Sequence, residues 1–215
     1  MAFRIESVLT GSVRPFADVD TSAIAKTAVD GLHAVRRLGI EGDAQADLSV
    51  HGGPDKAIHH YPRDHYAYWQ SALGALPVLQ QAGAFGENIS TTGLTEDIAC
   101  VGDRYRLGGA LVEIAQGRQP CWKQAHRLAN PAVVTTMVKS RRCGWYYRVI
   151  EEGFVAAGDD LVLLDRSHPE WTISRVIGLL IAGEGKNDTA AVAALAALPV
   201  LAENWRKRAA KMTRR

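Results

Sequence analysis

Cysteine is scarce in this chain of 215 residues, and the few cysteines form no recognisable pattern. Cys100, Cys121 and Cys143 stand far apart, and none belongs to a Cys-x-x-Cys pair. An odd and sparse set argues against a disulfide framework and for a reducing compartment. A long apolar run is missing too, because runs such as residues 176–182 are far shorter than the roughly 20 residues that cross a bilayer. Residues 1–8 show no secretion signal, so we expect a cytoplasmic protein without a membrane partner.

An excess of charge of one sign is absent as well. The chain has 25 lysines and arginines against 23 aspartates and glutamates, which gives a formal net charge of +2. A value so close to zero argues against nucleic acid as the main partner. Basic residues do gather near the C-terminus: Arg206, Lys207, Arg208, Lys211, Arg214 and Arg215. We interpret them as solvated cations at the end of a helix, with nucleic-acid binding as the weaker alternative.

Short runs of β-branched and aromatic residues, separated by Gly-Asp turns, dominate the chain up to residue 166. The runs that we predict as strands include residues 1–8, 104–107, 111–116, 144–150, 154–156 and 161–164. Many short strands with turn signals between them indicate a closed or nearly closed β-barrel. Helices are predicted to interrupt this pattern over residues 64–73, 121–128 and 131–139.

The character of the sequence changes after Asp165. Residues 170–182, 188–198 and 199–211 are predicted as helices. Asp188 suits the N-cap of the second of them, and Pro199 suits the first turn of the third. The sequence therefore predicts a mainly β fold with some α structure, in which a β-barrel domain over residues 1–166 precedes a small three-helix C-terminal unit over residues 167–215.

Cys121 is the residue best placed for chemistry. It follows a predicted strand that Pro120 ends, so its thiol is expected where the strand opens into a loop. Arg118 and Lys123 lie on either side of it and would favour the thiolate, which is the form that attacks electrophiles and binds metals. The alternative is a small buried apolar residue, which is a common fate of a free cysteine.

A second candidate is the segment from His51 to His60. The pair Gly52-Gly53 allows the backbone to approach an anion closely, and Lys56 adds positive charge, as a phosphate-binding turn requires. The histidines of this segment are further donors or acceptors. An ordinary turn is the alternative, because Gly-Gly-Pro-Asp is common in turns.

Weaker candidates complete the set. Asn88, after the tight turn expected at Gly86, offers a two-way amide hydrogen bond to a polar ligand. Lys26 and Thr27 supply a lone cation and a hydroxyl. A zinc site is a further alternative, although no familiar zinc spacing is present. Its ligands would come from His51, His59, His60, His65 and Cys121.

Several of these segments together carry a family resemblance. Residues 38–47 run into residues 51–57, and Gly86-Glu87-Asn88, residues 118–123 and residues 144–149 follow in that order. This series resembles the MOSC-domain family, and within it the YiiM-type proteins, which carry a short helical C-terminal extension. The resemblance covers the chain from about residue 5 to about residue 208.

The resemblance implies a β-barrel that binds the molybdenum cofactor, molybdopterin with its metal. In catalytic members of the family the cysteine of the motif binds molybdenum, which gives Cys121 the role of metal ligand. A larger set matches the positions expected to line the pterin and its phosphate: Lys26, Thr27, His51, Gly52, His59, Asn88 and Arg118. Either His51 or His59 would donate a proton during catalysis, and adjacent His60 could exchange roles with His59.

The implied activity is reduction of N-hydroxylated small molecules, such as hydroxylaminopurine base analogues, as a detoxification. Trp122 could then present a flat wall to an aromatic base, or pack into the barrel. No flavin, haem or iron–sulfur motif is visible, so we expect electrons from a separate donor of the flavodoxin or flavin-reductase type. A non-catalytic carrier of the cofactor, or of sulfur as a persulfide on Cys121, is the alternative. The sequence leaves a homodimer open.

Overall fold

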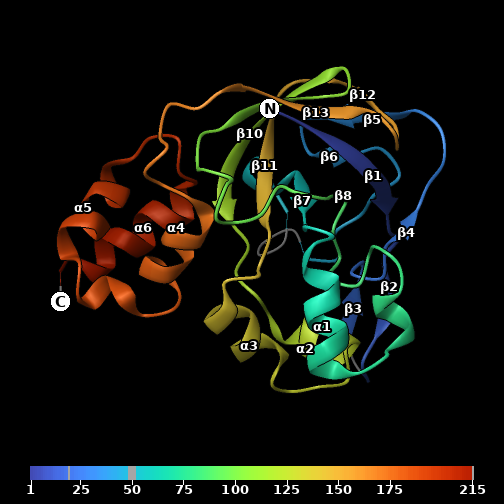
Figure 1. Cartoon of the computed structure of the whole chain (residues 1–215), viewed down its shortest axis with the longest axis horizontal. Helices are drawn as coiled ribbons and strands as arrows, with labels where there is room; N and C mark the ends of the chain where they lie inside the picture. The colour runs from blue at the N-terminus through green and yellow to red at the C-terminus, as the bar shows by residue number, and fades with distance from the viewer. Residues whose placement is uncertain (19, 48–51, 215) are drawn as a thin grey trace.

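The computed structural model describes residues 1–18, 20–47 and 52–214 of the chain (Figure 1). One predicted site residue, His51, lies outside this part. Within it, no helix is both long enough and apolar enough to cross a membrane.

A closed β-barrel forms the body of the protein, as the sequence predicts. Strand β13 pairs with β9 and also with β1, which closes the ring β13-β9-β10-β11-β7-β8-β1. Neighbouring strands in this ring are antiparallel except for β7 and β8, which are parallel. The barrel strands are β1 (Ala2–Thr10), β7 (Ile58–His60), β8 (Ile89–Thr91), β9 (Arg104–Leu107), β10 (Ala110–Gly117), β11 (Trp145–Glu151) and β13 (Asp160–Asp165).

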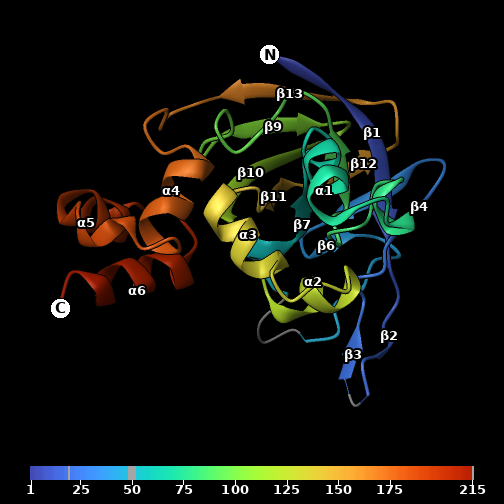
Figure 2. The same ribbon diagram turned by 60° about the horizontal axis from the view of Figure 1, so that its bottom comes forward.

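Further short strands lie outside the ring. Strand β4 (Thr27–Ala28) pairs with the end of β1, and β12 (Gly153–Val155) pairs with β5 (His33–Arg36), which also pairs with β6 (Gly39–Ile40). Strands β2 (Arg14–Phe16) and β3 (Asp20–Ser22) form a hairpin that projects from one end of the barrel, beside helix α2 (Figure 2).

Large aromatic side chains fill the core. Trp69, Trp145, Tyr61, Tyr105 and Tyr147 are among its largest fully buried side chains. Phe85 stacks on Tyr61 with ring centroids 4.1 Å apart. Burying one large apolar side chain contributes about 1.5–3 kcal/mol, so this cluster is a major source of stability for the barrel.

The helices lie in two groups (Figures 1 and 2). Helices α1 (His65–Leu73), α2 (Trp122–Arg127) and α3 (Val133–Ser140) lie around the end of the barrel that carries the hairpin. Helices α4 (Ile173–Leu180), α5 (Thr189–Ala197) and α6 (Glu203–Met212) lie together on one side, as the sequence predicts. Single 3-10 turns are η1 (Pro54–Lys56), η2 (Pro77–Leu79) and η3 (Glu184–Lys186).

One predicted cap is confirmed and one predicted helix start is wrong. The side chain of Asp188 accepts a hydrogen bond from the Ala191 N–H over 3.0 Å, which caps α5. Helix α6 begins at Glu203, not at Pro199. The reason is tertiary: the Ala202 N–H donates to the Ala115 carbonyl of β10 over 2.9 Å, which holds the chain before α6 against the barrel.

The C-terminal helices share one hydrophobic core with the barrel. A Cβ added to Gly117, at the end of β10, would lie 3.0 Å from Ile177 of α4 and 3.1 Å from Trp205 of α6, so these helices pack directly on the barrel. The division of the chain at residue 166 stays a prediction.

A buried carboxylate joins the barrel to the segment that leads into these helices. Asp103 is fully buried, and its two oxygens accept hydrogen bonds from the Arg166 guanidinium over 2.9 and 2.6 Å. The Cys100 N–H and the Tyr105 hydroxyl also donate to Asp103, over 3.0 and 3.2 Å. This network fixes the chain immediately after β13.

Asp103→Ala should lower the free energy of unfolding by about 3 kcal/mol, because it leaves the buried donors around Asp103 without an acceptor. Urea denaturation measures the loss. Arg106→Ala is the matched control: it removes an exposed pair with Glu151 and should cost less than about 1 kcal/mol. Equal losses in the two variants would contradict this role for Asp103.

His60 should make the fold sensitive to acid. Its ring nitrogens lie 3.0 Å from the Tyr147 hydroxyl and 2.9 Å from that of Thr91 inside the barrel, and burial lowers its pKa from 6.5 to about 3. The unfolded chain therefore takes up the proton first. The stability contributed by neutral His60 is complete above pH 6.5 and is lost as the pH falls toward 3.

We expect the free energy of unfolding to fall with acid more steeply in the parent than in His60→Gln. The difference in slope should reach about 1.4 kcal/mol per pH unit between roughly pH 6 and pH 4. Denaturation curves at several pH values measure both slopes. Parallel slopes would show that His60 does not contribute in this way.

Candidate active-site pocket

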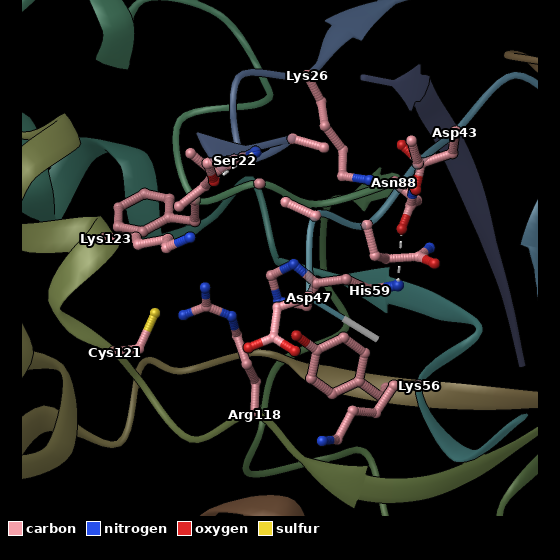
Figure 3. A pocket seen from close by; sticks show the side chains of 18 residues that line it. Ser22, Lys26, Asp43, Asp47, Lys56, His59, Asn88, Arg118, Cys121 and Lys123 are labelled. Carbon is pink, nitrogen blue, oxygen red and sulfur yellow. Dashed lines mark hydrogen bonds and ion pairs between the residues drawn. The ribbon is translucent and has the colours of Figure 1, made fainter. Parts of the chain in front are cut away.

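A polar pocket gathers residues from segments that lie far apart in the sequence (Figure 3). It is built at the hairpin end of the barrel by residues after β3, the loop after β6, strands β7 and β11, and the loop between β10 and α2. Its lining residues are Ser22, Ala23, Ile24, Lys26, Asp43, Ala44, Gln45, Ala46, Asp47, Lys56, His59, Phe85, Gly86, Asn88, Arg118, Cys121, Lys123 and Tyr146.

Cys121 lies in this pocket, at the start of α2. The structure places it as the sequence predicts, just beyond the end of β10, and its side chain is partly exposed rather than buried. Its Sγ atom points into the pocket on the side of Arg118 (Figure 3). The Cys121 N–H donates to Oε1 of Gln124 over 2.8 Å, a capping interaction that fixes the backbone of the cysteine. Cys-x-x-Gln resembles a capping box, but our sequence analysis missed it.

Arg118 is the least satisfied polar group of the pocket. Its side chain is buried, yet Nε and Nη1 have no hydrogen-bond partner among the described residues. Its backbone is held firmly, because the Arg118 N–H donates to the Gly144 carbonyl over 2.9 Å. A buried guanidinium with two donors that lack partners is costly, so these donors indicate a site for an anionic ligand.

Asp43 organises the opposite wall (Figure 3). It forms an ion pair with the buried Lys26 ammonium and accepts hydrogen bonds from the Gly11 N–H over 2.8 Å and from Nδ2 of Asn88 over 2.9 Å. Burial lowers the pKa of Lys26, and the charge of Asp43 opposes this effect. In the sequence, Gly42-Asp43 is one of the Gly-Asp turns and lies in the segment 38–47 of the family resemblance, but no local signal pairs Asp43 with Lys26.

Asn88 lies in the pocket, where its amide serves the protein itself. Its Nδ2 donates to the Leu9 carbonyl over 3.1 Å as well as to Asp43, and its Oδ1 accepts the His59 N–H over 3.0 Å. Both amide hydrogens are used in this way. Asn88 therefore ties β1, β7 and the loop of Asp43 together, and its contact with a ligand stays a prediction.

His59 is a neutral, buried group. Burial and then the charge of Arg118 hold the pKa of His59 well below its usual range, against an opposing hydrogen bond to the Gly86 backbone. Its Nε2 has no partner among the described residues. A ring that is neutral at pH 7 suits an acceptor or positioning role better than the proton-donor role expected from the sequence.

The other predicted residues lie elsewhere. Thr27 is exposed on β4, and neither Thr27 nor Gly52 lines the pocket, whereas neighbouring Lys56 does. Trp122 is 49% exposed and lies outside the lining, where it contacts Phe16 across 5.8 Å between ring centroids. It therefore neither packs into the barrel nor forms a wall of the pocket.

The zinc alternative has no support in the described part of the chain. His60 contacts Tyr147 and Thr91, and His65 contacts Glu96, so both rings have hydrogen-bond partners of their own. Over residues 1–18, 20–47 and 52–214, no three His, Cys, Asp or Glu side chains are grouped to hold a metal ion.

Comparison with known proteins agrees with this architecture. The MOSC domain model matches residues 47–162. Protein YiiM of Escherichia coli K12 is 43% identical over 159 residues, which is 74% of this chain and 71% of that protein. Uncharacterized protein YflK of Bacillus subtilis is 40% identical over 182 residues, 85% of this chain and 78% of that protein. A protein of Gibberella moniliformis named as a reductase is 38% identical over 157 residues, 73% of this chain but only 28% of that protein.

Solved structures show the same relation along nearly the whole chain. The crystal structure of YiiM from Geobacillus stearothermophilus has a TM-score of 0.83 at 33% identity and covers 98% of this chain and 99% of that one. YiiM from Escherichia coli has a TM-score of 0.82 at 31% identity and covers 99% of this chain and 92% of that one. The family that the sequence motifs suggested is therefore confirmed: this chain is similar to YiiM proteins over most of its length, and it belongs to the MOSC-domain family.

Proposed function

We propose that this protein is a molybdenum-cofactor-dependent reductase of N-hydroxylated compounds, such as hydroxylaminopurine base analogues. The observation that carries the proposal is the pairing, in one pocket, of the Cys121 thiol with the unpartnered buried donors of Arg118. Membership of the MOSC-domain family and the reductase name of the fungal relative support it.

The residues of the pocket fit this cofactor. Molybdenum is a metal for which a cysteine thiolate is a suitable soft ligand, and Cys121 supplies it. The phosphate of the pterin requires cationic donors. Four cations line the pocket, namely Lys26, Lys56, Arg118 and Lys123, against the carboxylates of Asp43 and Asp47. When bound, the cofactor supplies the two-electron chemistry that takes oxygen from an N–OH group.

Each protein residue has a simpler task. Arg118 binds the anionic part of the ligand, and Gln124 holds the backbone of Cys121 so that the thiol faces the pocket. Lys26, Asp43 and Asn88 form a rigid wall, because their polar groups bond to one another. Neutral His59 offers an acceptor nitrogen next to Arg118. Groups fixed in this way need little reorganisation when a ligand binds.

The proposal includes a separate electron donor of the flavodoxin or flavin-reductase type, since no motif for a second redox group is visible in the sequence. It also includes a reducing, cytoplasmic location, which is supported by the three free cysteines. A homodimer stays compatible with it.

Cys121→Ser should abolish molybdenum binding, because a serine hydroxyl is a far poorer ligand for this metal than a thiolate. The first measurement is the amount of molybdenum per protein after anaerobic purification from cofactor-replete cells. The second is the rate at which the protein reduces hydroxylaminopurine when a chemically reduced viologen dye supplies the electrons. Cys100→Ser is the matched control, because Cys100 is buried outside the pocket and should keep both properties.

The same experiment separates the proposal from the carrier alternative. Molybdenum without turnover in the parent would favour a cofactor carrier, and a persulfide on Cys121 without molybdenum would favour a sulfur carrier. Equal molybdenum in the parent and in Cys121→Ser would contradict the role of this residue as the ligand.

Arg118→Met should weaken retention of the cofactor by about tenfold or more, because it removes charge-assisted hydrogen bonds to the phosphate. The cofactor-free variant should unfold at an equal or higher temperature than the cofactor-free parent, since a buried cation with two unpartnered donors is replaced by an apolar side chain. Pterin fluorescence after oxidation measures the first effect, and thermal denaturation the second.

Arg106→Met, on the outer face of the barrel, is the control and should change neither quantity appreciably. A clear loss of stability in cofactor-free Arg118→Met would instead indicate that this guanidinium has a purely structural role.

A further inference from the structure

A second cavity of about 280 Å³ lies between helix α1, the loop that contains Glu96, the end of α3 and the start of α4. Its lining includes His65, Tyr68, Glu96, Arg141, Arg142 and Ser174. None of its lining residues belongs to the Cys121 pocket. It is thus a separate site, and neither the cofactor nor the proposed reaction accounts for it.

Three carboxylates line this cavity, and two of them have hydrogen-bond partners within the protein. Glu96 is buried, and its two oxygens bond to Nε2 of His65 over 2.6 Å and to the Gly144 N–H over 2.7 Å. Asp64 accepts the Gly93 N–H with both oxygens, over 3.2 and 3.0 Å. Asp97 is the remaining carboxylate of the lining and is exposed. Only Glu96 is buried, whereas Asp64 and Asp97 are exposed to solvent, which screens their charge.

Two arginines supply donors to the same cavity. Arg142 is held with its guanidinium 4.1 Å above the centre of the Tyr68 ring, and its backbone carbonyl accepts the Tyr61 hydroxyl over 3.1 Å. Arg141 reaches Ser174, with Nη1 3.5 Å from the hydroxyl oxygen, and also pairs with Glu184. Two guanidinium groups and a buried hydroxyl thus line one cavity, an arrangement that suits the oxygens of a phosphate or carboxylate.

Backbone conformation gives an independent indication. Arg141 ends α3 with a φ of 60°, in the left-handed region that a helix normally fills with glycine. An arginine there is strained relative to glycine. Glycine would adopt this backbone conformation with less strain, yet the protein has an arginine there, and Arg141 lines the cavity.

We propose that this cavity is a second ligand site, which takes a small molecule carrying a phosphate or carboxylate group between Arg141 and Arg142. The site is connected to the Cys121 pocket. The Gly144 N–H donates to Glu96 in the wall of the cavity, and the Gly144 carbonyl accepts the N–H of Arg118 in the pocket. A ligand that displaces Glu96 would thus alter the hydrogen bonds that connect Glu96 through Gly144 to Arg118.

The test uses the full-length, cofactor-free protein with inorganic phosphate and, separately, citrate as probes. Titration calorimetry should show saturable binding of one of them, and the preferred probe distinguishes a phosphate from a carboxylate ligand. The amide resonance of Gly144 in a nitrogen–proton correlation spectrum should shift as the site fills, because its acceptor lies in the wall of the cavity.

Arg141→Gly is the decisive variant. It should weaken binding by about tenfold or more while the melting temperature stays the same or rises, because glycine fits the left-handed position. Arg142→Gln should weaken binding to a similar extent. Arg118→Gln should leave binding in this cavity intact and remove only binding that belongs to the Cys121 pocket.

The outcomes are distinct. Binding that is lost in Arg141→Gly and Arg142→Gln but kept in Arg118→Gln supports the second site. No saturable binding of either probe overturns it, and so does binding that only Arg118→Gln removes. Because cofactor-free protein is used, each result is independent of whether the proposed reductase activity is found.

Discussion

The position of the candidate active site depends on one backbone constraint, which is the close approach of Gly144 to strand β7. Gly144 has a φ of 74°, and a Cβ there would lie 2.4 Å from the His60 carbonyl oxygen and 2.9 Å from Nε2 of His59. No other residue type fits such a space. In this position Gly144 accepts the Arg118 N–H with its carbonyl and gives its own N–H to Glu96. The loop that carries Arg118 and Cys121 is thereby placed.

Around this constraint, the pocket gathers several buried cations, and some donors of one of them lack hydrogen-bond partners among the described residues. Lys26 is paired with Asp43, and Lys123 lies 3.3 Å from Asp20 while donating to the Thr21 carbonyl over 2.6 Å. Arg118 keeps two unpartnered donors in the same pocket. Burial makes each of these cations expensive, and an anionic ligand would offset that cost. The buried cations of the pocket therefore lower the stability of the free protein at the place where we propose that the ligand binds.

Backbone strain at Arg141 is a second, smaller cost in stability at a proposed binding site. The two sites are also held by the same rigid barrel. The barrel is closed, its aromatic core continues into α4–α6, and the Asp103–Arg166 pair holds the connection between them. Helices α4 and α6 contact the barrel at Gly117, the residue before Arg118. Packing of the C-terminal helices therefore supports the very loop on which Cys121 depends.

The sequence by itself determined the helices and the longer strands of the fold, because strand alternation, Gly-Asp turns and helix caps are local signals. It did not indicate the short strands β7 and β8, which complete the ring. It also determined the family and the location of Cys121 at a strand end, because the motif cysteine follows directly from its neighbours. It failed for Pro199, where a single hydrogen bond from Ala202 to β10 overrides a favourable helix start.

Only the tertiary structure decided which polar groups face the pocket and which serve the frame. Asp43 joins the pocket through a partner 17 residues away in sequence, and Asn88 spends its amide on Leu9, 79 residues away. Thr27 is exposed on β4 and lies outside the pocket, although Lys26, just before that strand, lines it. Burial then decided the charge of His59. Long-range contacts and desolvation are properties of the folded chain, and no local pattern encodes them.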